Sequence, residues 1–352
     1  MGKGGEEKNM RKRYVMDFGS EVIRLVSEDG DLSLTEPAVA ALDRQTGKPV
    51  CFGQAAKTLA IRAPGSVDII YPYTDIEHMV HELLTGMMQH LAVCIGKKRG
   101  FRADLVLSYP GESGGDTEQL FLDAATDAGA LDVLMVDAAY AAYRGAGAGK
   151  YADVVVMNMG ASVIDMALVL NGRVKNMLSL HVGGRSYDDA LGDDIYDRHA
   201  LLLDDEGAEY VKNELATLKK QPEQKRGEVL FAGLKAAEDE DAGIRQPEEK
   251  KAEITGVYQT TGLPRTLSIG QRELTESMEP LFVQLAAAYG ELMKGQKGLG
   301  PDDRVILTGG FAKMSGMAER ISEMTGIHTE VALEPESCVL RGMLSMMEEG
   351  EI

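Results

Sequence analysis

Residues 152–180 read ADVVVMNMGASVIDMALVLNGRVKNMLSL, a stretch of three β-rich runs. Gly160 separates the first run from the second, and the Asn171-Gly172 dipeptide, which is typical of tight hairpin turns, separates the second from the third. The stretch therefore predicts a three-stranded β-meander.

The same design opens the chain. After a charged leader over residues 1–13, which we expect to be disordered, the runs RYVMDFG, EVIRLVSEDG and DLSLTEPAVAAL predict another meander. Each meander is followed by segments in which helical and strand patterns alternate, and this alternation favours parallel pairing. Two meanders with the same continuation predict a duplicated α/β domain.

Hydrophobic periodicity predicts the helices. A long amphipathic helix is expected over 74–95, with Thr74 and Glu77 as a capping box at its start. Residues 186–252 are more polar, and we interpret them as a largely helical peripheral subdomain with solvated charge runs. A strand at 264–269 and a helix over 271–294 are expected to follow it.

The composition is that of a folded protein. A length of 352 residues with 44% hydrophobic residues is enough for two ordinary domains. The net charge of −19 argues against binding to nucleic acid, because like charges repel. The sequence has no segment typical of a transmembrane helix or signal peptide, and its three cysteines lack the spacing of a disulfide framework or zinc site. A cytoplasmic protein is therefore expected.

Four segments carry a resemblance to a known family. They are VMDFGSEVIRLV at 15–26, DAAYAAYRGAG at 137–147, VVMNMGASVIDMALVLNGRV at 155–174 and VILTGGFAKMSGMAERI at 305–321. In this order and spacing they resemble the first phosphate loop, the connecting helix, the second phosphate loop and the adenosine motif of the actin superfamily. The chain looks nearest to the bacterial actins MreB and MamK.

This resemblance implies a fold and its division. The expected fold is an actin-like duplicated two-lobe α/β structure, with two ribonuclease-H-like domains around a nucleotide cleft. Lobe I would comprise 14–147 and 334–352, with a small subdomain at about 37–70. Lobe II would comprise 148–333, with an inserted subdomain at about 186–262.

The resemblance also implies ATP or ADP with Mg²⁺ as cofactors. Glycines in the two phosphate loops would let backbone N–H groups approach a phosphate, which a side chain would block. The residues expected to contact the nucleotide are Asp17, Gly19, Ser20, Asn158, Gly160, Ala161, Ser162, Lys235, Glu238, Gly309, Gly310 and Phe311. Asp17 is expected to hold Mg²⁺ through water.

The hydrolytic residues depart from the family pattern. Asn158 stands where the second loop normally has Asp, and Ala138 occupies the position of the residue that orients the attacking water. Asp137 is adjacent but points about 100° away along a helix, so it is a weak candidate. Glu21 near phosphates would be repulsive unless a metal or lysine intervenes. Hydrolysis is therefore expected to be slow or lost, with no catalytic residue assigned.

Two functions remain open. One is a bacterial cytoskeletal protein that binds nucleotide and self-associates into filaments, alongside protein partners that the sequence does not identify. The alternative is a non-polymerising adaptor or scaffold with the actin fold. A sugar or acetate kinase of the same superfold is disfavoured by Ala138 and Asn158.

Two further patterns are set aside. GAGAGK at 145–150 lacks the spacing of a phosphate-binding P-loop and leads into a strand. His78 and His81 are three residues apart on the predicted helix, and we interpret them as surface residues rather than metal ligands.

Overall fold

The computed structural model describes residues 11–73, 80–111, 115–214 and 251–352. The chain divides into two compact units. The first comprises Met1–Arg185, Ala287–Lys313 and Ile327–Ile352, and the second comprises Ser186–Ala286 and Met314–Gly326. The predicted capping box at Thr74 and Glu77 lies outside the described residues, as does His78.

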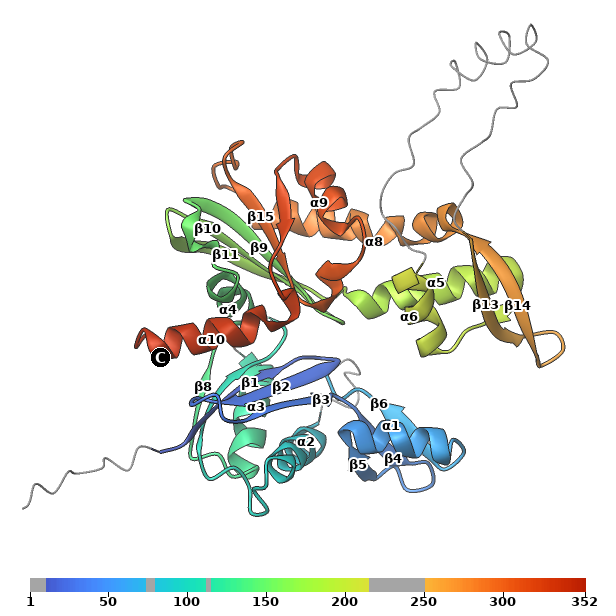
Figure 1. Cartoon of the computed structure of the whole chain (residues 1–352), viewed down its shortest axis with the longest axis horizontal. Helices are drawn as coiled ribbons and strands as arrows, with labels where there is room; N and C mark the ends of the chain where they lie inside the picture. Colours follow the sequence, from blue (N-terminus) through green and yellow to red (C-terminus); the bar gives the residue numbers. More distant parts are fainter. Residues whose placement is uncertain (1–10, 74–79, 112–114, 215–250) are drawn as a thin grey trace, which may run out of the picture. The chain divides into compact units, whose positions relative to one another are not determined.

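Two five-stranded sheets form the first unit (Figure 1). One has the order β3-β2-β1-β7-β8, with β1 at Arg13–Phe18, β2 at Val22–Ser27, β3 at Ser33–Pro37, β7 at Asp104–Ser108 and β8 at Asp132–Met135. The other has the order β11-β10-β9-β15-β16, with β9 at Asp153–Met159, β10 at Ile164–Leu170, β11 at Arg173–Leu180, β15 at Arg304–Thr308 and β16 at Thr329–Val331.

The two sheets have the same topology. In each, three antiparallel strands form a meander, a fourth strand pairs parallel to the first strand of the meander, and a fifth pairs parallel to the fourth. The predicted duplication is confirmed, and the strands correspond in the order β1 to β9, β2 to β10 and β7 to β15.

Two cores lie on opposite faces of the first sheet, and four helices of this unit contribute to them. These helices are α2 (His81–Cys94), α3 (Gly115–Asp127), α4 (Ala138–Gly145) and α10 (Cys338–Glu348). Strand β1 alternates between the cores, because Tyr14, Met16 and Phe18 face the core that includes α2 and α3, and Val15 faces the core that includes α4 and α10. The second core also takes Val154 from β9, so it joins the two sheets.

A small subdomain within the first unit precedes α2. Its sheet has the order β5-β4-β6, with β4 at Ala40–Asp43, β5 at Pro49–Phe52 and β6 at Val67–Ile70, and helix α1 covers Gly53–Arg62. Val39, Ala41, Ala56 and Val67 form its buried centre. The third run of the first predicted meander thus spans two strands, β3 and β4, which lie in different sheets.

The second unit mixes helices with a small sheet. It contains most of α5 (Gly184–His199), α6 (Asp205–Glu214), most of α8 (Gln271–Leu292) and α9 (Met317–Thr325), with a sheet of order β12-β13-β14. The predicted strand at 264–269 is β14 (Leu263–Gly270), but its partner β13 (Lys251–Tyr258) was not predicted. Strand β13 follows a long run of charged residues in the sequence. It is recognised as a strand only by its antiparallel pairing with β14. Within the described ranges, no helix is long and apolar enough to cross a bilayer.

The remaining described elements are short. Strand β12 covers Leu201–Leu202, and 3₁₀ turns cover Ala148–Lys150, Gly310–Lys313 and Pro335–Ser337. The GAGAGK segment spans the end of α4 and the first of these turns and then enters β9, so it does not open a helix.

Helices α4 and α10 meet backbone to backbone. A Cβ atom at Gly145 would lie 1.8 Å from the Cys338 carbonyl oxygen, and one at Gly342 would lie 1.8 Å from the Ala141 carbonyl oxygen. Neither position has room for a side chain, since the obstructing atoms belong to the facing backbone.

We therefore expect Gly342→Ala to destabilise the chain by about 3 kcal/mol, because the helices must separate to admit a methyl group. Thermal unfolding followed by circular dichroism would measure the loss. Gly290→Ala is the matched control: Gly290 is exposed on α8 and its Cβ would meet no atom within 4 Å, so the change should be neutral or stabilising. Equal melting temperatures for Gly342→Ala and the wild type would contradict the close contact.

Candidate functional site

The two sheets present the same tight turn at corresponding places. Gly19 follows β1, and a Cβ there would lie 2.5 Å from the Val22 carbonyl oxygen. Gly160 follows β9, and a Cβ there would lie 2.8 Å from the Val163 carbonyl oxygen. In both turns the obstructing carbonyl is three residues further on. Both positions therefore require glycine, for the same steric reason.

Strand register places a pair of polar residues just before each turn. Asp17 is opposite Arg24 on β2, and Asn158 is opposite Asp165 on β10. The partners on the parallel side are Ser108 for Asp17 and Thr308 for Asn158. The Thr308 hydroxyl donates to Asn158 Oδ1 at 3.2 Å. The two sheets thus differ in charge at equivalent positions. The first has the acid Asp17 opposite the base Arg24, and the second has the amide Asn158 opposite the acid Asp165.

Asp165 is the buried acid of this site. Its Oδ1 accepts hydrogen bonds from the Gly111 backbone N–H at 2.9 Å and from the Ser179 hydroxyl at 2.6 Å. Its Oδ2 is buried and has no well-formed hydrogen bond, although the Asn158 amide opposite it is near enough to favour the ionised form. The bond to Gly111 links the loop after β7 to strand β10, and so links the two sheets.

Burial raises the pKa of both acids. For Asp165 the pKa rises from 3.8 to about 7, because desolvation and the nearby charge of Asp137 outweigh the hydrogen bonds from Ser179 and Gly111. For Asp17 the pKa rises from 3.8 to about 6, because desolvation outweighs the attraction of Arg24. Carboxylates that are costly to ionise in this way are typical of sites that take a cation or a proton.

Two segments pack against the turn after β9. The Arg185 N–H donates to the Ala161 carbonyl at 2.8 Å, and the Gly184 N–H donates to the Gly160 carbonyl at 3.1 Å. Gly309 has φ +83°, and a Cβ there would lie 2.3 Å from the Met159 carbonyl oxygen. The start of α5 and the turn after β15 therefore both pack against this loop by backbone contact.

Arg185 also neutralises Glu21. Its guanidinium donates to Glu21 Oε2 at 2.7 Å and lies 3.3 Å from the centroid of the Tyr71 ring. The repulsion expected of an unpaired Glu21 is therefore reduced by an arginine rather than by a metal or a lysine. This interaction connects the turn after β1, the residue that follows strand β6, and the start of α5 within the first unit.

The remaining predicted residues have different surroundings. Asp137 caps α4, where its Oδ1 accepts from the Ala139 and Tyr140 N–H groups, so its side chain has a structural role. Ala138 is buried at the first position of that helix. Gly310 has open space around a would-be Cβ, while Phe311 is buried in the 3₁₀ turn that follows β15. Lys235 and Glu238 lie outside the described residues.

Several buried polar side-chain atoms that lack a hydrogen-bond partner belong to residues in the two turns or in register with the residues just before them. They include Ser108 Oγ, Ser162 Oγ and Asp165 Oδ2. Ser20 is also buried, and its N–H and hydroxyl belong to the turn after β1. Such atoms are costly to leave unsatisfied, so they fit a site that binds a polar ligand.

Sequence reasoning did not single out Asp165, Ser108 or Arg185. The signal that could have found Asp165 is the internal repeat itself: aligning DFG at 17–19 with NMG at 158–160 puts Arg24 and Asp165 in register. Arg185 carried no such signal, because its partners Glu21 and Tyr71 are more than a hundred residues away in sequence.

Comparison with solved structures identifies the class of fold. The crystal structure of MreB5 of Spiroplasma citri bound to ADP matches with a TM-score of 0.78 and 19% identity, over 97% of this chain and 98% of that one. The MamK double helical filament matches with a TM-score of 0.70 and 15% identity, over 96% of this chain and 99% of that one. The chain has the two-lobe actin-like fold, as predicted.

Sequence comparison defines the family. The sequence profile of the MreB/Mbl protein family matches residues 11–239 and 237–351. The cell shape-determining protein Mbl of Bacillus cereus is 26% identical over 340 residues, covering 95% of each chain. The cell shape-determining protein MreB of Escherichia coli is 24% identical over 340 residues, covering 93% of this chain and 90% of that protein. The chain belongs to the MreB/Mbl family of bacterial actin-like proteins.

The raised pKa of Asp165 predicts a pH effect on stability. Folded Asp165 keeps a proton that the unfolded chain has already lost, so stability should fall as the pH rises from about 4 to about 7. We expect Asp165→Asn to be more stable than the wild type at pH 8, by about 2–4 kcal/mol, and to match it at pH 4. Asn can still accept the hydrogen bonds from Gly111 and Ser179.

Unfolding by urea at both pH values, without nucleotide and Mg²⁺, would measure this difference. Asp123→Asn, an exposed substitution on α3, is the matched control and should keep the wild-type pH profile. A parallel pH dependence in Asp165→Asn and the wild type would rule out the buried acid as the cause.

Proposed function

We propose that this chain is a cytoskeletal protein that binds ATP or ADP at the turns after β1 and β9 and polymerises into filaments in the bacterial cytoplasm. Hydrolysis of the nucleotide is slow or lost. The observation that carries the proposal is the pair of equivalent turns, in which Gly19 and Gly160 leave no space for a side chain. Backbone N–H groups there can approach phosphate oxygens directly.

The surrounding polar atoms support a phosphate ligand. The hydroxyls of Ser162 and Ser108 are buried and unsatisfied, and a phosphate is an acceptor for both. Gly309, with φ +83° and its close approach to Met159, lets the chain after β15 pass near the same loop, where the nucleoside would lie. The Spiroplasma citri relative of the same fold was crystallised with ADP.

The acids of the site suit Mg²⁺. This ion prefers carboxylate and water oxygens and usually keeps several waters. Asp17 would hold it through water, and Asp165, whose Oδ2 lacks a good partner, would replace the carboxylate lost at Asn158. When bound, Mg²⁺ would neutralise phosphate charge and favour the ionised form of both acids.

The same geometry supports slow turnover. Ala138 carries no group that can orient water, and Asp137 is committed to capping α4. Asp165 is an acid near the start of this helix, since the charge of Asp137 acts on it. Its raised pKa, about 7 without a cation, suits a proton acceptor at neutral pH, but Gly111 and Ser179 already occupy one of its oxygens, and bound Mg²⁺ would favour its ionised form and so weaken it as an acceptor. We assign residual turnover to Asp165.

Family membership and a relative's assembly support self-association. MamK, with the same fold over 96% of this chain, was solved as a double helical filament. A head-to-tail contact between protomers does not close on itself, so it generates filaments. We assign the contacts along the strand to the small subdomain at about 37–70 and the inserted subdomain at about 186–262.

The test of the function is pelleting combined with negative-stain electron microscopy, using purified protein with ATP, ADP or no nucleotide, each with Mg²⁺. We expect filaments that depend on nucleotide, and fluorescent ATP bound more tightly with Mg²⁺ than with a chelator. Asp17→Asn should weaken Mg²⁺-ATP binding at least ~10-fold while changing Mg²⁺-free binding little, because it removes a ligand-shell acid. Asp123→Asn is the control.

Two outcomes would count against this function. A chain that binds nucleotide but stays monomeric in every condition would point to the non-polymerising adaptor. A chain that binds no nucleotide would remove the site assignment itself.

The hydrolytic assignment makes its own prediction. Phosphate release from ATP should be slow in the wild type, and Asp165→Asn should lower it by a further ~10²-fold, since proton transfer by a positioned acid contributes about that much. Ser179→Ala should change it less, because the carboxylate remains. Turnover that is unaffected by Asp165→Asn would refute the role of Asp165.

A further inference from the structure

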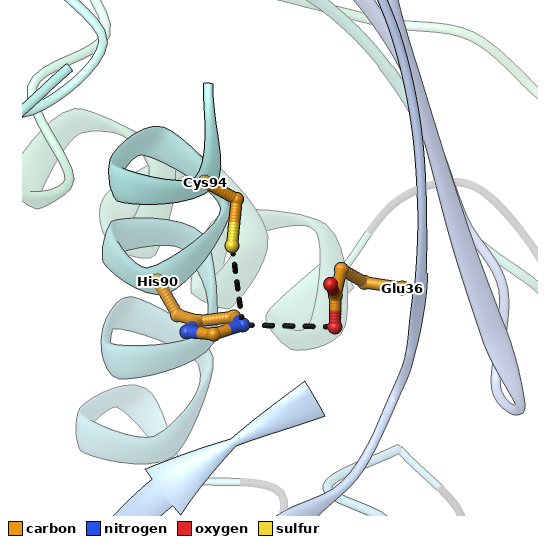
Figure 2. A group of neighbouring side chains, drawn as sticks. All are labelled: Glu36, His90 and Cys94. Atoms are coloured by element: carbon orange, nitrogen blue, oxygen red, sulfur yellow. Dashed lines mark hydrogen bonds and ion pairs between the residues drawn. The ribbon is translucent and has the colours of Figure 1, made fainter. Parts of the chain in front are cut away.

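Three side chains with metal-binding atoms meet away from the phosphate turns. Figure 2 shows Glu36, from β3, facing His90 and Cys94, which both come from α2. His90 Nε2 lies 3.7 Å from Glu36 Oε2 and 3.5 Å from Cys94 Sγ. All three atoms lie within 4.8 Å of one another.

The fold brings these residues together for local reasons. His90 and Cys94 are four residues apart, so they lie on the same side of α2, beside its buried stripe of Leu84, Met87 and Leu91. Glu36 pairs with Ile23 in the sheet and reaches the helix from the other side. The side chains of Glu36 and His90 are 15% and 23% exposed, and Cys94 is exposed, so the group is half-buried and reachable from solvent.

Gly53 leaves the space that this group occupies. It has φ +62°, and a Cβ there would lie 2.2 Å from Glu36 Oε2 and 2.8 Å from His90 Nε2. The next residue, Gln54, donates its backbone N–H to Glu36 Oε2 at 2.9 Å. The carboxylate is thus oriented by the first turn of α1, as the ligands of metal sites commonly are by outer hydrogen bonds.

We propose that Glu36, His90 and Cys94 bind one divalent transition-metal ion of the zinc class. Thiolate, imidazole and carboxylate are the three ligand types that Zn²⁺ takes in proteins, and three protein ligands with water in the fourth position form a common tetrahedral set.

The distances fit this geometry. A tetrahedral ion with metal–nitrogen and metal–sulfur bonds of about 2.0 and 2.3 Å would hold nitrogen and sulfur about 3.5 Å apart. The observed separation of His90 Nε2 and Cys94 Sγ is 3.5 Å. The carboxylate oxygen lies 3.7 Å from the same nitrogen, a few tenths of an ångström more than the separation that a tetrahedral ion would set between them, and all three atoms lie within 4.8 Å of one another.

Charge favours the same ion. A divalent cation among the three groups would attract both the carboxylate and the thiolate and would stabilise the deprotonated thiol. Thiolate and carboxylate together would neutralise the ion, with His90 as a neutral ligand.

The ion would connect three parts of the first unit. Glu36 belongs to the outer strand of the first sheet, and His90 and Cys94 belong to α2. Gln54, which donates to Glu36, lies in the first turn of α1 of the small subdomain. A metal here would therefore fasten the small subdomain to the first sheet and to α2. This inference is independent of nucleotide binding.

The experiment is cobalt and zinc titration of the untagged full-length protein after treatment with a chelator. We expect one Co²⁺ per chain, with a thiolate-to-cobalt charge-transfer band and the intense visible bands of a tetrahedral ion, both displaced by Zn²⁺. Cys94→Ser should abolish the charge-transfer band. Cys94→Ser and His90→Gln should each weaken Zn²⁺ binding at least ~10-fold in competition with a chromogenic chelator.

Matched controls come from the same region. Cys51→Ser removes another free cysteine, on β5, and His81→Gln removes another histidine of α2; both should bind Zn²⁺ like the wild type. Zn²⁺ should raise the melting temperature of the wild type and of both controls, but not of Cys94→Ser. Circular dichroism would verify that each variant is folded.

Two results would overturn the proposal. One is a wild-type cobalt spectrum without the thiolate band, which would leave the three residues as a hydrogen-bonded group. The other is unchanged zinc affinity in both Cys94→Ser and His90→Gln, which would place any bound ion elsewhere.

Discussion

The contact between α4 and α10 is the constraint on which the first unit depends. At Gly145 and Gly342 each helix leaves no room for a side chain, and the obstructing atoms are carbonyl groups of the other helix. The core around this contact takes Val15 from one sheet and Val154 from the other. The separation of the two sheets is therefore set by backbone contact between helices. Because Gly19 and Gly160 follow strands β1 and β9 of these sheets, the placement of both turns follows from it.

The two sheets share a topology but carry different charged residues just before their glycine turns. Asp17 and Arg24 face each other before the first turn, and Asn158 and Asp165 do so before the second. Asn158 itself carries no acid, yet the carboxylate of Asp165 stands on the adjacent strand in direct register with it. The second half therefore still offers an acid, but one that is buried, hydrogen-bonded on one oxygen and costly to ionise. These properties are consistent with retained cation binding and poor proton transfer.

Several polar interactions join segments that are distant in sequence. Glu21 is neutralised by Arg185, and Asp165 accepts from the Gly111 backbone. Glu36 orients the start of α1 while facing His90 of α2. In each case a carboxylate that would be unfavourable by itself has a partner supplied by another element, which is the general condition for keeping a charge half-buried. The acidic composition of the chain is thus tolerated at its internal sites by specific pairing.

The sequence by itself determined the two meanders, the alternation that follows them, and the glycines of the two turns. These features depend on local properties: period-two hydrophobicity, hairpin dipeptides and the steric freedom of glycine. The resemblance also predicts the loss of an acid at Asn158 and of a water-orienting group at Ala138, and both stay predictions. Strand β13 was not predicted, because its β-signal depends on pairing with β14.

Only the tertiary structure decided which distant side chains meet. Strand register places Asp165 opposite Asn158. The approach of the start of α5 to Glu21 and Tyr71 places Arg185. The packing of α2 beside β3 places Cys94 near Glu36. Such pairings depend on distances across the fold, which no short stretch of sequence encodes, since they arise from packing among elements remote in the chain.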